Sequence, residues 1–307
     1  MNSPVTPTSN SADITTERIR YGRAFGACAE AYDRARSGYP PSLIRDVWRF
    51  ASQPRVQLVL EVGAGSGKAT IPFAELGASI DCIEPSRRMS KILRARCSAL
   101  PDVRVLTTSF ERWKPHRHYC LLIAAQSWHL IDPDIRLAKA ALVLRPGGTL
   151  ALLWNEPPRP VSETVRQTLY SVLGEWGLDL TGPRPSFPAQ GHPACQPGSL
   201  PPLYSSPDFA TTRPKTYWTA YRLTLRTYVD ILSTYPEYRA LGAADRQWLT
   251  RRLGSAVFAR GSLDAGHQTM LHLARRTMPD EPAGNDVIFH PESLNSAMVR
   301  SAPHATR

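Results

Sequence analysis

The sequence predicts an α/β protein built on a doubly wound, mostly parallel sheet with helices on both faces. Between residues 56 and 155, short apolar runs alternate with amphipathic segments. Such alternation is typical of parallel strands joined by crossover helices. The pattern stops over residues 157–206, and strand-like and helix-like periodicity resumes after them. The chain therefore reads as one sheet-based core that is interrupted by an insertion.

The N-terminal region precedes the first predicted strand. Residues 1–17 are rich in Ser, Thr, Pro and Asn and are predicted to be a disordered tail. Two helical patterns follow between residues 18 and 52, the second starting after Pro40 and Pro41. They open a core domain that we predict over residues 18–156.

The core contains five predicted strands, at residues 56–63, 79–84, 103–108, 119–126 and 148–155. Helices are predicted from about Lys68, from Ser86, and over residues 133–144. In a sheet of this kind, ligands bind at the carboxyl ends of the strands. Candidate functional residues are therefore expected where these strands end.

The interrupting segment, residues 157–206, contains ten prolines around one helical patch at 162–176. A connecting loop is rarely this long, so we interpret the segment as a cap insertion over the strand ends.

The last third of the chain is predicted to complete the core over residues 207–280. It holds a strand and a helix within 208–235, a helix at about 243–254 and a last strand at 267–277. Residues 281–307 are predicted to be a loose tail.

Composition and charge limit the possible partners. The net charge of +11 raises a nucleic-acid hypothesis. However, 32 of the 37 basic residues are arginines spread along the chain, which favours a composition bias over a binding stripe. No apolar run approaches the roughly 20 residues of a membrane helix, and the N-terminal region has no apolar secretion segment. We expect a cytoplasmic monomer or homodimer without membrane association, and the spread of the charge disfavours a nucleic-acid partner.

The scattered cysteines show no metal-ligand spacing, so no metal site is expected.

The segment LEVGAGSGKAT, residues 60–70, is compatible with three kinds of binding loop at first sight. A phosphate-binding P-loop needs a glycine and a hydroxyl residue where this chain has Val62 and Ala69. A dinucleotide-binding loop needs a third glycine where, counting from the first, this chain has Lys68. Both of these loops are therefore disfavoured.

The remaining pattern is Gly-x-Gly-x-Gly at Gly63, Gly65 and Gly67, directly after a predicted strand. Alternating glycines let the backbone turn tightly and approach a ligand closely. Glu61, at the strand end, can reach an ammonium group. The next strand ends at Glu84, which is placed to accept both hydroxyls of a ribose. An adenosine that carries an amino acid fits this arrangement better than a nucleotide does.

Five motifs in order resemble those of the class I S-adenosylmethionine-dependent methyltransferases. They are EVGAGSGKAT, IEPSRRM, TTSFERW, AAQSWHLID and VLRPGGTLALLWN. Upstream, AYDRARSGYP is similar to a signature of the bacterial small-molecule, type 11-like branch, with Ser37 in place of a proline. The resemblance implies a Rossmann-like sheet of seven strands, the last antiparallel. It also implies S-adenosylmethionine as cofactor and S-adenosylhomocysteine as product.

The resemblance also implies which residues contact the cofactor. Glu61 would lie near the amino group, Glu84 would bind the ribose, and Met89 would pack on the adenine. The other implied cofactor residues are Tyr32, Arg36, Gly63, Ala64, Gly65, Gly67, Pro85, Ser109, Phe110 and Gln126.

The residues expected around the acceptor follow the fourth and fifth strands. His129 is a candidate general base, since an ordinary histidine pKa of about 6.5 suits proton transfer; a role in only orienting a loop or lining the pocket stays open. Trp128, Trp154 and Asn155 are predicted to line the substrate pocket. The fourth motif lacks the Asn or Asp-Pro-Pro-Tyr/Phe of amino-group methylases, which disfavours a base or side-chain amide nitrogen as acceptor.

The sequence thus predicts methyl transfer to an oxygen or activated carbon of a small molecule. Two alternatives stay open. One is a methyltransferase that acts on RNA or another macromolecule, which the charge would favour. The other is a protein that binds the cofactor without methyl transfer, as a cyclase or a binding partner, because fold does not fix chemistry.

Overall fold

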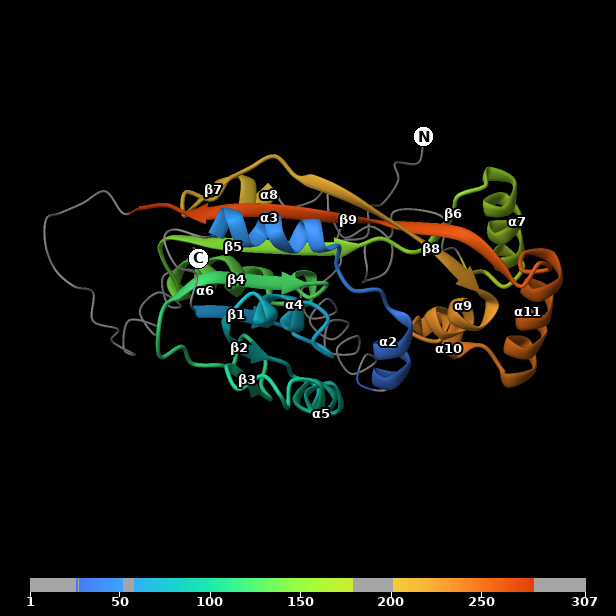
Figure 1. Cartoon of the computed structure of the whole chain (residues 1–307), viewed down its shortest axis with the longest axis horizontal. Coiled ribbons are helices and arrows are strands. Elements are labelled where there is room, and N and C mark those ends of the chain that lie inside the picture. The colour runs from blue at the N-terminus through green and yellow to red at the C-terminus, as the bar shows by residue number, and fades with distance from the viewer. Residues whose placement is uncertain (1–25, 27, 52–57, 179–200, 279–307) are drawn as a thin grey trace, which may run out of the picture.

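The computed structural model describes residues 26, 28–51, 58–178 and 201–278. Five parallel strands form one side of a nine-stranded sheet, from its edge inward in the order β3 (Val103–Leu106), β2 (Ser79–Ile83), β1 (Leu58–Val62), β4 (Tyr119–Ala125) and β5 (Leu144–Asn155) (Figure 1). The α/β class and the parallel core predicted from the sequence are confirmed.

A long strand, β9 (Ser262–Arg276), continues the sheet antiparallel to β5. On its other side β9 pairs with β8 (Lys215–Thr224) and with the short β7 (Phe209–Thr211), and beyond the end of β5 it pairs with β6 (Arg159–Pro160). The prediction of an antiparallel last strand is confirmed. The sheet has nine strands rather than seven, because β9 spans 15 residues and has room for two partners along each edge.

Helices cover both faces of the parallel strands, as the doubly wound class requires. On one face, α3 (Pro41–Ala51), α4 (Thr70–Glu75) and α5 (Arg87–Arg96) pack on inward side chains such as Val59 and Leu121. On the other, α6 (Pro133–Val143) packs on Leu122 and Leu150. Neighbouring strand residues point to opposite faces, so each apolar run supplies two cores. A fully buried leucine contributes about 1.5–3 kcal/mol to folding.

A third core lies beyond the carboxyl ends of the parallel strands, at the right of Figure 1. It joins helices α7 (Glu163–Gly174), α9 (Leu225–Leu232), α10 (Pro236–Ala240) and α11 (Ala243–Ala256), which we call the helical layer. Helix α2 (Ala29–Ala35) contacts this layer through Ala35.

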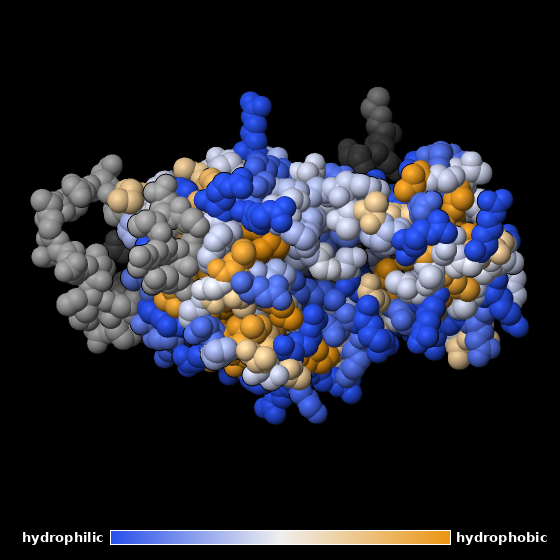
Figure 2. Space-filling view, in the orientation of Figure 1, coloured by the Kyte–Doolittle hydropathy of each residue, from blue (hydrophilic) through white to orange (hydrophobic). Residues whose placement is uncertain are grey.

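The helical patch predicted inside the 157–206 segment corresponds to α7, and the short α8 (Pro201–Tyr204) lies near the end of that segment. Residues 179–200 of the predicted cap lie outside the described residues, as do both predicted tails. In the described part of the chain, no helix has the length and apolar character needed to cross a bilayer. Figure 2 shows hydrophobic side chains in separate areas among hydrophilic ones on this face.

Candidate functional site

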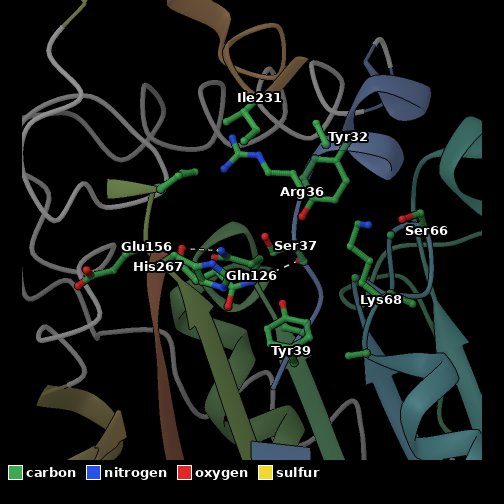
Figure 3. Close-up of a pocket in the computed structure, with 18 of the residues that line it drawn as sticks. Tyr32, Arg36, Ser37, Tyr39, Ser66, Lys68, Gln126, Glu156, Ile231 and His267 are labelled. Carbon is green, nitrogen blue, oxygen red and sulfur yellow. Dashed lines mark hydrogen bonds between the residues drawn. The ribbon is translucent and has the colours of Figure 1, made fainter. Parts of the chain in front are cut away.

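Two adjacent cavities lie where the parallel strands end. The large cavity, of about 830 Å³, is lined by Glu84, Pro85, Met89, Ser109 and Phe110, among others. The small cavity lies between the strand ends and the helical layer (Figure 3). Both are lined by Tyr32, Gly63, Gly65, Ala125 and Gln126. These shared residues form the junction of the two cavities.

The glycine loop after β1 forms this junction. Gly63 has a φ of 69°, and a Cβ there would lie 2.4 Å from the Ser127 Cβ. Ser127 is held in place because its hydroxyl donates to the Val62 carbonyl. Gly65 has a φ of 58°, yet nothing lies within 4 Å of where its Cβ would be. Gly63 thus permits close packing, while Gly65 leaves open space for a ligand.

Gly67 was predicted to contact the cofactor, but it lines neither cavity. Its φ is 89°, and a Cβ there would lie 2.6 Å from the Leu93 Cδ1. The absence of a side chain at Gly67 therefore serves the packing of the loop on α5.

Glu84 directly follows β2 at the wall of the large cavity and is 6% exposed. Its Oε2 accepts from the Gly65 backbone N–H at 2.8 Å, and its Oε1 accepts from that of Ser86 at 2.7 Å. Burial raises the pKa of Glu84, while these hydrogen bonds act to lower it. Each oxygen keeps a further lone pair, so the carboxylate can still accept a pair of ligand hydroxyls.

Glu61 lies deeper, at 1% exposed, and lines the small cavity. Its Oε2 accepts from the Thr70 hydroxyl at 2.6 Å. Burial raises the pKa of Glu61 to about 8; the Thr70 hydrogen bond opposes this, and the charge of Glu84 adds to it. A ligand ammonium group at this place would favour the ionised form of Glu61.

The start of α5 shapes the far wall of the large cavity. Ser86 caps the helix by accepting from the Met89 backbone N–H at 3.3 Å, which fixes Met89 at the cavity. Phe110 reaches the same cavity from the segment after β3. Met89 and Phe110 thus offer the kind of apolar surface that a planar ring needs.

Gln126 has a φ of 58°, which is unusual for a residue with a side chain. Its backbone N–H donates to the Leu153 carbonyl, and its Nε2 donates to the Asn155 carbonyl at 2.8 Å. Such backbone conformations cluster at functional sites, where the surroundings hold them in place. Asn155 lines the small cavity as predicted, and its Nδ2 donates to the Gly38 carbonyl at 3.1 Å.

Helix α2 closes the small cavity from the side of the helical layer. Arg36 donates to the Thr234 hydroxyl at 2.6 Å and to the Tyr235 hydroxyl at 3.1 Å. Its guanidinium lies 4.4 Å from the centre of the Tyr235 ring. Figure 3 shows Tyr32 and Arg36 together on one side of the cavity. Arg36 therefore connects the cavity wall to the residues that follow α9.

His129, the predicted base, lies in the core and lines neither cavity. It belongs to the 3-10 helix η1 (Trp128–Leu130), is 3% exposed, and its Nδ1 accepts from the Trp154 indole at 3.4 Å. Burial, with a smaller contribution from Arg136, lowers the pKa of His129 to about 3. The prediction of a catalytic base at His129 is therefore wrong.

The predicted substrate-pocket roles of Trp128 and Trp154 are corrected for the same reason. Their exposed fractions are 1% and 3%, and both rings belong to the core under α6. The turn of η1 directs Trp128 into that core, and Trp154 packs into the same core from β5.

Sequence reasoning missed several residues of the small cavity. They are Ser37, Tyr39, Ser66, Lys68, Glu156, Tyr221, Ile231 and His267. Tyr221 lies on β8 and His267 lies on β9. The sequence signal that could have indicated them is the alternation of side chains between the two faces of these strands. The last strand was predicted to begin at residue 267, whereas β9 begins at Ser262 and carries His267 well inside it.

Comparison with known proteins adds a family match. A family model described as a methyltransferase domain matches residues 59–148. An uncharacterized methyltransferase of Mycobacterium tuberculosis is 32% identical over 233 residues, which cover 73% of this chain and 91% of that protein. The demethylmenaquinone methyltransferase of Tropheryma whipplei is 31% identical over 166 residues, covering 52% of this chain and 68% of that protein.

Among solved structures, one described as a type II methyltransferase from Anaeromyxobacter dehalogenans aligns with a TM-score of 0.60. The alignment covers 80% of this chain and 99% of that one at 22% identity, which is a likeness of fold alone.

Proposed function

The chain belongs to the class I S-adenosylmethionine-dependent methyltransferases, and from this premise we propose that it methylates an oxygen or activated carbon of a small molecule, with S-adenosylmethionine as the donor. When bound, that cofactor supplies an electrophilic methyl group on a sulfonium sulfur. Methyl transfer then depends mainly on positioning. The residues of the two cavities must therefore hold donor and acceptor in line.

The residues of the large cavity and the junction fit the cofactor. Glu84 would accept from the ribose hydroxyls, and Glu61 would pair with the amino group. Met89 and Phe110 would pack on the adenine. The open space at Gly65 is a cradle that a Cβ would fill. We infer that the methionine part lies at the junction, next to the small cavity.

Two alanine variants of the glycine loop separate packing from binding. Gly63→Ala is expected to destabilise the fold by more than about 2 kcal/mol, since it adds a clash to an unfavourable φ. Gly65→Ala is expected to lower the free energy of unfolding by only about 1 kcal/mol, from the unfavourable φ alone. It is expected to weaken S-adenosylhomocysteine binding several-fold. Urea unfolding and calorimetric titration of both variants measure the two effects. Equal binding by parent and Gly65→Ala would contradict the placement of the ligand.

One observation carries the proposal of a small acceptor: the small cavity adjoins the junction and is bounded opposite the strand ends by the α2 region and by α9. Ala35 and Arg36 of the α2 region and Ile231 of α9 line it opposite the strand ends. A demethylmenaquinone, the acceptor in the name of one relative, is likewise a small molecule. We place the enzyme in the cytoplasm, acting without nucleic acid or membrane.

The experiment compares two acceptor pools. The protein is incubated with S-adenosylmethionine and either a low-molecular-weight metabolite extract or purified RNA, and S-adenosylhomocysteine is quantified. We expect product only with the metabolite extract. Product with RNA, at a rate that falls steeply with salt, would favour the macromolecular alternative. Product with neither pool would favour binding without transfer.

A further inference from the structure

One wall of the small cavity is formed by the paired strands β8 and β9. His267 on β9 lies directly opposite Thr219 on β8, and Tyr221 lies two residues further along β8 on the same face. His267 and Tyr221 both line the cavity. The His267 and Tyr221 rings lie 5.7 Å apart, centre to centre. Figure 3 shows His267 beside Gln126 at this wall.

Buried polar atoms on these two strands lack hydrogen-bond partners in the described part of the chain. His267 is 1% exposed, yet neither of its ring nitrogens has a hydrogen-bond partner among the described residues. The Thr219 hydroxyl opposite it lacks one there as well. A buried polar group without a partner costs about 1–3 kcal/mol. Such a cost at a cavity wall points to a ligand that supplies the missing hydrogen bonds.

The charges around the cavity restrict the chemistry of that ligand. Lys68 donates to the Asp33 carbonyl and lies 3.9 Å from its carboxylate, and Glu156 pairs with Arg159 at 2.6 Å. Glu61 is assigned to the amino group of the cofactor. A charged acceptor group would therefore compete with existing contacts. Burial lowers the pKa of His267 to about 4, so its ring is neutral at pH 7 and offers one donor and one acceptor.

Arg36 places a fixed positive charge at the same cavity, while its N–H groups are directed to Thr234 and Tyr235. A positive charge nearby lowers the pKa of an acidic hydroxyl, which makes that hydroxyl a stronger hydrogen-bond donor while it is still protonated. It favours hydroxyl groups that are themselves acidic, which phenols and enols are and alkyl alcohols are not.

We propose that His267 recognises the methyl acceptor by accepting a hydrogen bond from a phenolic or enolic hydroxyl. The proposal rests on the proposed function and narrows its acceptor class, since phenols present an oxygen and enols an oxygen or an activated carbon. His267, rather than His129, is then the histidine that contacts the acceptor. Tyr221 lines the same wall, and Thr219 lies behind it as the β8 partner of His267.

The test uses phenol and fluorobenzene, which have nearly the same shape but differ in the hydroxyl. Calorimetry first establishes that the protein binds S-adenosylhomocysteine; failure at this step rejects the proposed function itself. With that ligand saturating, NMR titration is expected to show about tenfold tighter binding of phenol than of fluorobenzene, the worth of one buried hydrogen bond. Equal affinities, or no phenol binding up to its solubility limit, would overturn the role of His267.

The variant His267→Phe is expected to bring the two affinities within about twofold while S-adenosylhomocysteine binding is kept. His272→Phe is the matched control, because His272 lies on the same strand, is 3% exposed and lines neither cavity. It should keep the preference for phenol. A preference that survives in His267→Phe would overturn the proposal.

The thermal stability of the His267 variants gives a second test of whether this residue serves the ligand or the fold. Because His267→Phe removes two unpaired polar atoms, its melting temperature without ligand is expected to equal or exceed that of the parent. If phenylalanine proves too large and the variant does not fold, His267→Leu serves the same purpose. Marked destabilisation of both variants would identify His267 as a structural residue and overturn the proposal.

Discussion

Glu84→Ala is expected to weaken S-adenosylmethionine binding by at least tenfold. The variant loses a carboxylate that can accept both ribose hydroxyls in charge-assisted hydrogen bonds. It also loses the acceptor that holds the Gly65 backbone N–H at 2.8 Å, so the glycine loop is less well ordered for the ligand. Calorimetric titration of the parent and the variant measures the loss.

A control variant and a conservative variant show whether a loss of affinity in Glu84→Ala is due to the carboxylate at this site. Glu75→Ala removes an exposed carboxylate at the end of α4 and should leave the affinity unchanged. Glu84→Gln keeps one carbonyl oxygen without the charge and should bind with intermediate affinity. If Glu84→Ala binds as tightly as the parent, Glu84 does not contact the ribose.

Glu61→Gln is expected to stabilise the protein at alkaline pH while weakening cofactor binding. Because burial raises the pKa of Glu61 from 4.5 to about 8, the folded state binds its proton more tightly than the unfolded state does. The bound proton of Glu61 therefore contributes to the free energy of unfolding. This contribution is complete below pH 4.5 and is lost as the pH rises to about 8. Above that range, the resulting loss of folding free energy is on the order of 5 kcal/mol. Glutamine carries no such proton, so the loss disappears in the variant.

Urea unfolding of the unliganded parent and Glu61→Gln at pH 5 and pH 9 measures this effect. The two stability curves should lie close together at pH 5, and the variant should be the more stable protein at pH 9. Addition of S-adenosylhomocysteine at pH 9 should stabilise the parent more than the variant. A variant that is less stable than the parent at pH 9 would contradict the assignment of a buried, proton-binding Glu61.

The parts of the site that follow from local backbone chemistry could be predicted from the sequence. Gly63 and Gly65 adopt positive φ values directly after a strand. Alternating glycines in the sequence indicate a turn that needs such values. Glu84 directly follows the next strand, so its place beside the loop follows from the parallel order of β1 and β2. Predicting the positions of these residues required only the strand boundaries and the rule that ligands bind at the carboxyl ends of parallel strands.

The acceptor side depends on tertiary structure and could not be predicted in the same way. His129 follows a strand as Glu84 does, but η1 turns it into the core beside Trp154. His267 comes late in the chain, and its place at the cavity depends on β9 running antiparallel between β5 and β8. Period-two alternation shows which strand residues share a face. It does not show which end of that face meets the glycine loop.

Calorimetric titration of the parent protein with S-adenosylmethionine, S-adenosylhomocysteine and NADH tests the central assignment of the strand-end site most directly. We expect micromolar binding of the two sulfur ligands and no binding of NADH, since the loop lacks the third glycine of a dinucleotide-binding turn. Binding of NADH, or of none of the three, would contradict the assignment of the glycine loop, Glu61 and Glu84 to an S-adenosylmethionine site.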